Sequence, residues 1–296
     1  MGLSRRLFIG ASLSAATASV MAGANVAEAS ATKPQKWDKT VNVVIIGSGG
    51  AGLATAVSAA ENGVKDILVL EKLAFLGGNT AIATGAFNTA DPKQKEQGIE
   101  DSPELHAQQT LKGGDFRANP ELVNELSHNS YDTLTWLESK GVKFQPKILQ
   151  VYGALWPRSH ATAASKGSDY IRVLSEEAKK LGVTIQTQAK VVDIIRENQL
   201  SGRALGVEYL NKDGQHVFVR ALKAVVACPG GFGANREMRS MHDPSLYKLT
   251  TPNKPATSNG DVHVMMQDIG ADVTGMDHLK CNPGYPPGSK IRDKRI

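Results

Sequence analysis

The chain has 296 residues, of which 41% are hydrophobic and 21% are charged. It is long enough for one large or two ordinary domains, and its composition excludes an intrinsically disordered or multispanning protein. Thirty-four Lys and Arg residues against 29 Asp and Glu residues give a formal net charge of +5, with much of the excess in Arg5, Arg6 and the last seven residues. Because the body between these ends is close to neutral, the sequence gives no electrostatic argument for nucleic-acid binding.

The first 29 residues have the pattern of an export signal. The paired Arg5 and Arg6 precede a long uncharged stretch rich in Ala, Ser and Thr, which ends in a small-x-small cleavage site at Ala27–Ala29. This stretch is too weakly apolar to be a good membrane anchor. We expect residues 1–29 to be a signal peptide for the twin-arginine export machinery, residues 30–40 to be a linker, and the protein to reside in the periplasm. The alternative is a short amphipathic or uncleaved helix.

The mature chain opens with a β-α-β unit. Val41–Ile46 is a short apolar run rich in β-branched residues, and Ile67–Leu70 is a second such run, so both are expected to be buried parallel strands. Between them, Ala51–Asn62 is rich in alanine and is expected to be helical, with Gly63 ending the helix.

Further helices and strands follow this unit. Residues 101–140 are expected to be helical, with Pro103 and Pro120 in first-turn positions, and Ser168 is expected to cap a helix that ends at Gly182. Strands are expected at 183–187, 191–196, 204–210, 216–222 and 224–227, with a hairpin turn at Asp213–Gly214. The sequence therefore predicts a Rossmann-like α/β fold with a central parallel sheet and an inserted antiparallel β-meander.

A glycine fingerprint follows the first strand and opens the first helix. Gly47, Gly49 and Gly52 have the Gly-x-Gly-x-x-Gly spacing, and Glu71 stands 19 residues beyond Gly52 at the end of the next strand. Such glycines allow the backbone to approach a pyrophosphate, which is bound by amides at the helix N-terminus. The acidic residue is expected to accept hydrogen bonds from the ribose hydroxyls.

Small residues after the second strand favour FAD over a nicotinamide cofactor. Gly77–Thr80 and Ala83–Ala86 continue the run of small side chains, although a nicotinamide-binding fold is expected to pass directly into its next β-α unit. Such residues allow the backbone to pass beneath a flat ring system that needs amide donors. A flexible loop is the alternative interpretation.

Four runs together resemble the FAD-dependent fumarate reductase and succinate dehydrogenase flavoproteins. They are GSGGAGLATAVSAAENG at 47–63, LVLEK at 68–72, GGNTAIATGAFNTA at 77–90 and VACPGGFG at 226–233. The resemblance is strongest to the soluble periplasmic branch of flavocytochrome c fumarate reductases and urocanate reductases. It implies that residues 41–283 are the first segment of an FAD-binding domain and that residues 284–296 begin a truncated clamp domain.

The resemblance also implies the cofactor contacts. Glu71 matches the ribose contact, Val192 matches a residue whose backbone meets the adenine, and Asp261 matches an acidic residue near the flavin side. The implied FAD-binding residues are Gly47, Ser48, Gly49, Gly50, Ala51, Gly52, Glu71, Lys72, Gly78, Asn79, Thr80, Thr84, Gly85, Ala86, Val192, Ala227, Gly230, Gly231 and Asp261. Asn79-Thr80 stands where the complex-forming branch attaches FAD through histidine, which implies non-covalent FAD.

The histidines and cysteines indicate no metal site. None of the seven histidines has metal-ligand spacing. Cys228 and Cys281 form no Cys-x-x-Cys pair, which excludes zinc ribbons, thioredoxin-like redox motifs and covalent haem attachment.

The resemblance implies a hydride transfer from reduced flavin to a small α,β-unsaturated carboxylate, with electrons from a separate periplasmic cytochrome. Asn282 replaces the family's substrate-binding histidine, which puts fumarate itself in doubt. The family's catalytic positions lie beyond Ile296, so the catalytic residues are unknown. Two alternatives remain. One is a flavin ketosteroid dehydrogenase, which a pair of tyrosines at the ring face would mark. The other is a non-catalytic, truncated FAD-binding fragment that holds FAD poorly.

Overall fold

The computed structural model describes residues 34, 36–151, 154–249, 251, 257–277 and 279, which all belong to the unit Lys33–Ile296. The expected signal peptide at 1–29, the substrate-site position Asn282 and the expected clamp segment 284–296 lie outside the described residues.

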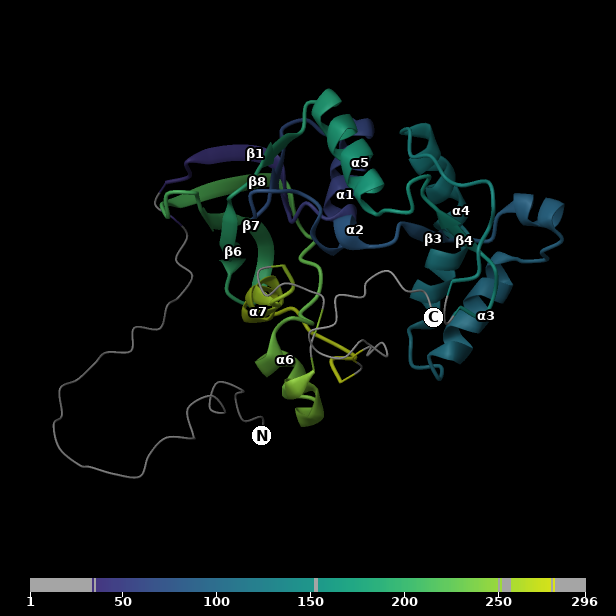
Figure 1. Ribbon diagram of the computed structural model, residues 1–296. Coiled ribbons are helices and arrows are strands. Elements are labelled where there is room, and N and C mark those ends of the chain that lie inside the picture. Colours follow the sequence, from purple (N-terminus) through teal and green to yellow (C-terminus); the bar gives the residue numbers. More distant parts are fainter. Residues whose placement is uncertain are drawn as a thin grey trace. The chain divides into compact units, whose positions relative to one another are not determined.

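A six-stranded sheet forms the centre of the described fold, in the order β5-β2-β1-β8-β7-β6 (Figure 1). Its strands are β1 (Lys39–Ile46), β2 (Ile67–Leu70), β5 (Thr184–Gln186), β6 (Lys190–Asn198), β7 (Ser201–Leu210) and β8 (His216–Ala227). The pairs β5-β2, β2-β1 and β1-β8 are parallel, whereas β8-β7 and β7-β6 are antiparallel. The predicted α/β class, with a parallel sheet and an antiparallel meander, is confirmed.

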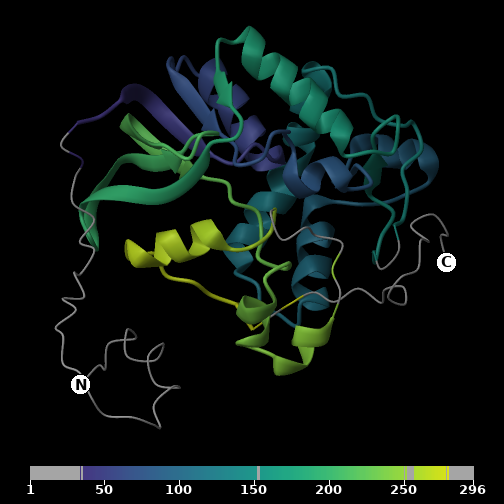
Figure 2. The same ribbon diagram turned by 60° about the vertical axis from the view of Figure 1, so that its left-hand side comes forward.

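Both faces of β2 and of the second half of β1 are buried, which explains their uninterrupted apolar runs. Val43, Ile45 and Val69 point to one face and pack in a core with residues of α1 (Gly50–Glu61) and α5 (Ser168–Lys180). The alternate residues Val44, Ile46 and Leu68 point to the opposite face. They pack in a second core with residues of the meander and of α7 (Asp261–Asp268). Figure 2 shows α5 and α7 on opposite sides of the sheet.

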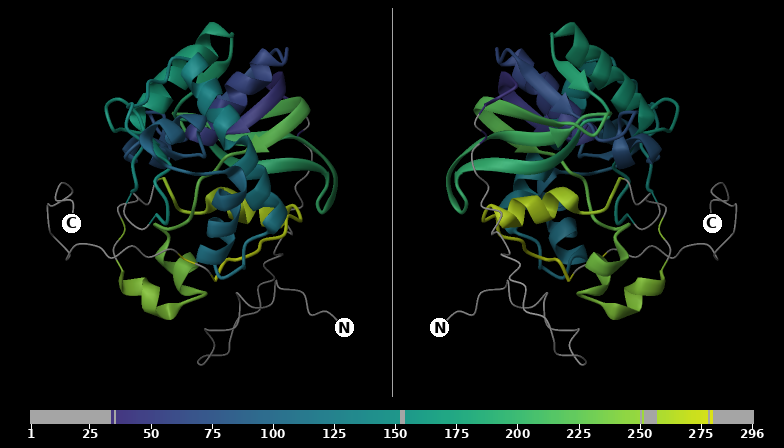
Figure 3. Two further views of the ribbon diagram at one scale, coloured as in Figure 1. Left: turned by 90° about the vertical axis from the view of Figure 1, so that its right-hand side faces the viewer. Right: turned by 90° about the vertical axis from the view of Figure 1, so that its left-hand side faces the viewer.

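The remaining elements follow the predicted helical region and the loops. They are α2 (Gly78–Ile82), β3 (Ala86–Asn88), η2 (Pro92–Gln97), α3 (Pro103–Gly113), α4 (Pro120–Ser139), β4 (Ser159–Ala161), α6 (Arg236–Ser240) and η3 (Pro244–Lys248). Pro103 and Pro120 occupy first-turn positions as predicted, after the N-caps Ser102 and Asn119. Strands β3 and β4 form a separate antiparallel pair, and α7 lies along β6 (Figure 3).

Several predicted boundaries differ from the structure. The region 101–140 that was expected to be helical is two helices, α3 and α4, which are separated by residues 114–119, and β1, β6 and β7 begin earlier than expected. The helix α5 is capped by Gly167, and Ser168 is its first helical residue. Gly167 N donates to the Ala83 carbonyl (2.8 Å), and a Cβ on Gly167 would lie 1.9 Å from the Thr80 oxygen, so this close approach to α2 requires a glycine. The expected strands 216–222 and 224–227 are one strand, β8, and its last four residues are half-buried rather than buried. An extra residue in β8 between the pairs Val41–Ala221 and Val43–Ala224 forms a bulge that allows the strand to continue.

None of the helices in the described part of the chain combines the length and the apolar character that a bilayer crossing requires.

Candidate functional site

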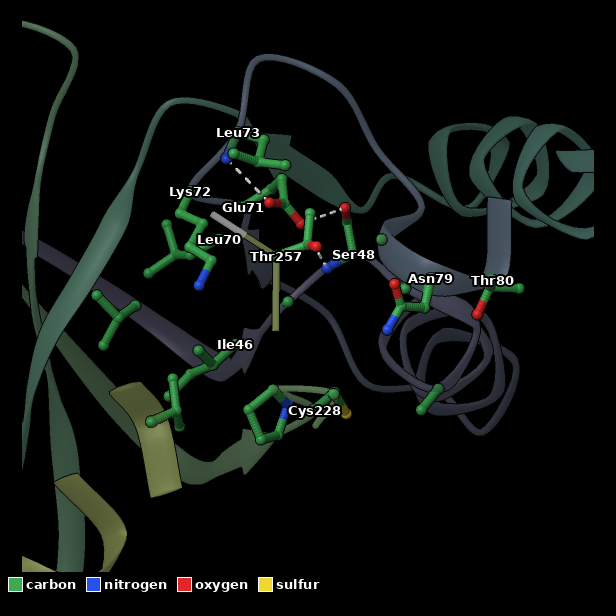
Figure 4. A pocket seen from close by; sticks show the side chains of 18 of the residues that line it. Ile46, Ser48, Leu70, Glu71, Lys72, Leu73, Asn79, Thr80, Cys228 and Thr257 are labelled. Atoms are coloured by element: carbon green, nitrogen blue, oxygen red, sulfur yellow. Dashed lines mark hydrogen bonds between the residues drawn. The ribbon is translucent and has the colours of Figure 1, made fainter. Parts of the chain in front are cut away.

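A cavity of ≈ 370 Å³ lies where the carboxyl ends of β1, β2 and β8 meet (Figure 4). The chain leaves β1 toward β2 on one side, while β8 flanks β1 on the other, so the cavity lies at the topological switch point of the parallel strands. Open α/β sheets bind their ligands in this crevice. The lining comprises Ile46, Gly47, Ser48, Gly49, Gly50, Ala51, Leu70, Glu71, Lys72, Leu73, Gly78, Asn79, Thr80, Ala189, Val191, Cys228, Pro229, Gly230, Thr257, Asp261 and Val262.

The three fingerprint glycines have different structural roles. Gly47 has a φ of +99°, and a Cβ there would lie 2.4 Å from the Cys228 carbonyl oxygen. A Cβ on Gly52 would lie 1.9 Å from the Gly47 oxygen, so Gly52 allows α1 to pack against the loop. Gly49 lines the cavity, and a Cβ there would meet nothing closer than the Gly77 oxygen at 3.9 Å. Gly49 therefore leaves space for a ligand, whereas the other two permit the turn itself.

The N-terminus of α1 faces this space and favours an anion. Gly49 is its N-cap and provides no side-chain cap, and the first turn contains no acidic residue. First-turn amides have no acceptor within their own helix and carry the positive end of the helix dipole. One of them, Gly50 N, donates to Thr80 Oγ1 (3.1 Å), which fixes the start of α1 to α2. An uncapped helix N-terminus that follows a glycine-rich turn is the kind of site that binds a pyrophosphate.

Glu71 holds the glycine loop against the end of β2. Its Oε2 accepts hydrogen bonds from Ser48 N (3.1 Å) and Ser48 Oγ (2.6 Å), and its Oε1 accepts one from Leu73 N (2.9 Å). The residue is buried, with 7% of its surface exposed. A carboxylate has about four acceptor sites, so three are used within the chain and one on Oε1 is left for the predicted ribose contact.

Side-chain contacts join two walls of the cavity. One wall is formed by the glycine loop and the end of β2, and the other includes Thr257, Asp261 and Val262. Lys72 Nζ donates to Asp261 Oδ2 and to Asn259 Oδ1, both at 3.0 Å. Asn79 Nδ2 donates to Ser258 Oγ at 2.9 Å. Asp261, which was expected near the flavin, is thus paired with a lysine of the same cavity.

The cavity collects most, but not all, of the predicted FAD-binding residues. Those outside its lining are Gly52, Thr84, Gly85, Ala86, Val192, Ala227 and Gly231. Gly85 packs against Thr162 and Lys166, and its carbonyl accepts a hydrogen bond from Tyr170 Oη (2.9 Å). Val192 is the bulged residue of β6, between the pairs Val191–Tyr209 and Asp193–Glu208. Its backbone is therefore outside the regular ladder, although its neighbour Val191 lines the cavity.

Several lining residues were not predicted. They are Ile46, Leu70, Leu73, Ala189, Val191, Cys228, Pro229, Thr257 and Val262. Ile46 and Leu70 are the last residues of β1 and β2, so their position at the carboxyl edge could have indicated them. No local pattern marks Ala189, Thr257 or Val262, because the folded chain brings them to the site.

Cys228 lines the cavity, and its side chain packs against the core that contains α1. Burial raises the pKa of this thiol, and a hydrogen bond with Thr55 lowers it in part. Cys228 is a free cysteine, while Cys281 lies outside the described residues. In the described ranges, no three His, Cys, Asp or Glu side chains are placed to hold a metal ion.

The sheet, the glycine turn and the anion-binding helix end define a dinucleotide-binding domain. Known proteins identify the dinucleotide, because residues 42–294 match the family model described as "FAD binding domain". The chain belongs to this family, as the FAD-binding domain of the fumarate reductase and succinate dehydrogenase flavoproteins, and the resemblance seen in the sequence is confirmed.

Two curated relatives show the extent of the match. The acrylate reductase flavoprotein subunit of Shewanella woodyi is 32% identical over 294 residues, which cover 96% of this chain and 57% of the relative. The urocanate reductase of Eggerthella lenta is 33% identical over 253 residues, which cover 84% of this chain and 41% of the relative. The chain thus spans about half the length of the curated relatives it matches.

Solved structures agree with this assignment. The open conformation of a flavocytochrome c3 fumarate reductase superposes with a TM-score of 0.73 and 30% identity, over 80% of this chain and 41% of that one. The 3-ketosteroid-Δ4-(5α)-dehydrogenase of Rhodococcus jostii also gives 0.73, with 28% identity, over 84% of this chain and 57% of that one. The fold alone therefore does not distinguish the two reactions that these proteins are named for.

Proposed function

We propose that this chain is the flavin-binding part of a reductase that acts on a small α,β-unsaturated carboxylate. The observation that supports this best is the cavity at the switch point, with the open Gly49 position beside the uncapped end of α1. The relatives named for acrylate, urocanate and fumarate support the substrate class, because all three molecules are α,β-unsaturated carboxylates.

The residues of the cavity would bind and orient FAD. The glycine-loop and α1 amides would neutralise the pyrophosphate, and the free acceptor of Glu71 would take a ribose hydroxyl. Ile46, Leu70 and Val262 provide apolar walls that exclude water from the cofactor. Once reduced by an electron donor, bound flavin would supply a hydride to one carbon of the double bond, and a proton donor would complete the reduction at the other carbon.

FAD is proposed to be held without a covalent bond. Asn79 occupies the position where the resemblance places a histidine in the covalent branch, and its amide is used to donate to Ser258. An amide nitrogen is not a nucleophile that attaches to the flavin. Denaturation in trichloroacetic acid should release all the yellow colour into the supernatant, and colour that stays with the pellet would contradict this assignment.

The reaction is tested on the full gene product loaded with FAD. Oxidation of reduced viologen is followed with acrylate, urocanate and fumarate, and dehydrogenation of a 3-ketosteroid is followed with a dye acceptor. We expect turnover with at least one of the carboxylates. Turnover with the steroid alone would reject the proposal and favour a ketosteroid dehydrogenase. The steroid is included because the fumarate reductase and the ketosteroid dehydrogenase structures superpose with the same TM-score, 0.73.

A pair of glycine variants links this activity to the cavity. Gly49→Val fills the space that the structure leaves beside α1 and should abolish both FAD binding and turnover. Gly113→Ala is the control, because that position lies at the end of α3 and an added Cβ would meet only Leu155 at 3.9 Å. Equal FAD content in the two variants would contradict the proposed site.

The protein is proposed to act in the periplasm, with a cytochrome as its electron donor. The support is the arginine pair and cleavage pattern of the first 29 residues, together with relatives named as cytochrome-type fumarate reductases. Replacing Arg5 and Arg6 with Lys should leave the precursor in the cytoplasm, while the exposed Arg220→Lys control should be exported normally. An unchanged periplasmic yield of the double variant would reject twin-arginine export.

A further inference from the structure

The segment 257–261 crosses from the second wall of the cavity to the start of α7. Ser258 is buried, with 1% of its surface exposed, and its carbonyl accepts a hydrogen bond from Ala234 N (3.0 Å). Gly260 has a φ of +76°, and a Cβ there would lie 2.5 Å from the Met238 sulfur. On this side the segment is fixed to residues near α6, and this attachment does not depend on the cavity.

On the cavity side, the segment is held by residues that are distant in sequence. Lys72 reaches from the end of β2 and contacts both Asn259 and Asp261, at 3.0 Å each. Asn79 adds a second attachment through Ser258. The side chains of Lys72 and Asp261 are only 22% and 19% exposed, so solvent screens this ion pair less than an open surface pair.

The position of these contacts relates them to cofactor retention. Lys72, Asn79, Thr257 and Asp261 all line the cavity, and Figure 4 shows Lys72 and Thr257 beside Glu71 and Ser48. A dinucleotide held by the glycine loop on one wall is therefore covered by 257–261 on the other. Movement of this segment would require the contacts of Lys72 to break.

We propose that Lys72 is a positioning residue, which fastens the segment 257–261 across the cofactor cavity through Asn259 and Asp261 and thereby slows the release of FAD. This role concerns FAD, which the family assignment supplies, and does not depend on the substrate. A lysine is suited to it because one ammonium group has three donors and can bind both oxygens at once.

The test measures FAD release from the full chain in Lys72→Met, Asp261→Asn and the double variant. Lys72→Met keeps the length of the side chain and removes its charge. The control is Lys140→Met, which removes the ion pair of Lys140 with Glu61 between α4 and α1, where the side chains are similarly exposed. FAD release is followed by the recovery of flavin fluorescence after dilution.

We expect Lys72→Met to release FAD about tenfold faster because both contacts of the ammonium group are lost; a factor of ten corresponds to about 1.4 kcal/mol. Asp261→Asn should have a smaller effect because the contact with Asn259 remains, and the double variant should be no faster than Lys72→Met. Lys140→Met should match the wild type. If the two single effects multiply in the double variant, Lys72 acts on FAD directly and the proposal is wrong.

A second measurement uses the protein without FAD. Amide hydrogen exchange in residues 257–268 should be faster in Lys72→Met than in the wild type and unchanged in Lys140→Met. Unchanged exchange in Lys72→Met would overturn the proposal even if FAD release were accelerated. Because this readout needs no substrate and no cofactor, it does not depend on the proposed reaction.

Discussion

The Glu71 carboxylate is predicted to support the fold before it supports the cofactor. Glu71→Gln replaces two acceptor oxygens by one oxygen and one NH₂ group. In one orientation the amide oxygen accepts from Ser48 and the NH₂ faces the Leu73 N–H, which is itself a donor. In the other orientation the NH₂ faces the Ser48 N–H. Either way, a backbone donor loses its acceptor.

The expected loss of stability follows from this count. A buried donor left without a partner costs about 1–3 kcal/mol, and hydrogen bonds to a charged group lie at the upper end of this range. Glu71 is 7% exposed, so water does not readily replace the lost acceptor. We expect the free energy of unfolding of the FAD-free chain to fall by about 1–3 kcal/mol. FAD affinity should fall in addition, by about 1–2 kcal/mol.

Urea denaturation of the FAD-free protein, followed by circular dichroism, measures the first effect, and titration with FAD measures the second. Glu125→Gln on the exposed face of α4 is the matched control and should leave both unchanged. Ser48→Ala should destabilise the chain by less when Glu71 is already Gln, because the two side chains share one hydrogen bond. An FAD-free Glu71→Gln protein as stable as the wild type would refute the reasoning.

Three further predictions concern packing and ionisation. Gly52→Ala should prevent stable folding around the glycine loop, since the added Cβ would lie 1.9 Å from the Gly47 oxygen. Gly113→Ala is the control and should be tolerated, and thermal melting measures the stability of both variants. Burial lowers the pKa of His106, so the unfolded chain binds its proton more tightly and stability falls as the pH drops below about 6.5. His106→Gln should reduce this loss in urea titrations at pH 7 and pH 5.5, and an identical loss would contradict it. Because burial raises the pKa of the Cys228 thiol, iodoacetamide should modify it more slowly in the folded chain than in urea. Equal rates of modification in the folded chain and in urea would contradict this prediction.

The sequence predicted the elements whose signals are local. The limits of β2 agree with the expected strand because all four of its residues are apolar and buried. Pro103 and Pro120 marked helix starts because proline fixes φ where no amide donor is needed. The glycine fingerprint likewise indicated the loop, since the close approach of Gly52 to the Gly47 oxygen excludes any side chain.

The features that the sequence could not reveal depend on tertiary contacts. Lys72 and Asp261 are 189 positions apart, and nothing near either residue indicates that they pair. The carboxylate of Glu71 was expected to face the ribose, but its main partner is Ser48, which the turn of the loop brings within 2.6 Å. The sequence predicted two strands separated at Lys223, which is charged and exposed. In the structure a bulge against β1 accommodates the extra residue, so β8 continues through this position.

The place of β8 in the sheet determines when the cofactor site can form during synthesis. Strand β1 pairs with β2 soon after both are made, but its other edge waits for β8, whose Ala227 pairs with Ile46. Contacts between such distant parts of a chain form slowly. The nascent chain therefore carries an open, apolar strand edge until residue 227 has left the ribosome, which is a state prone to aggregation. Asp261, which lines the opposite wall of the cavity, is made later still, so the complete lining exists only after all six strands of the sheet have been synthesised.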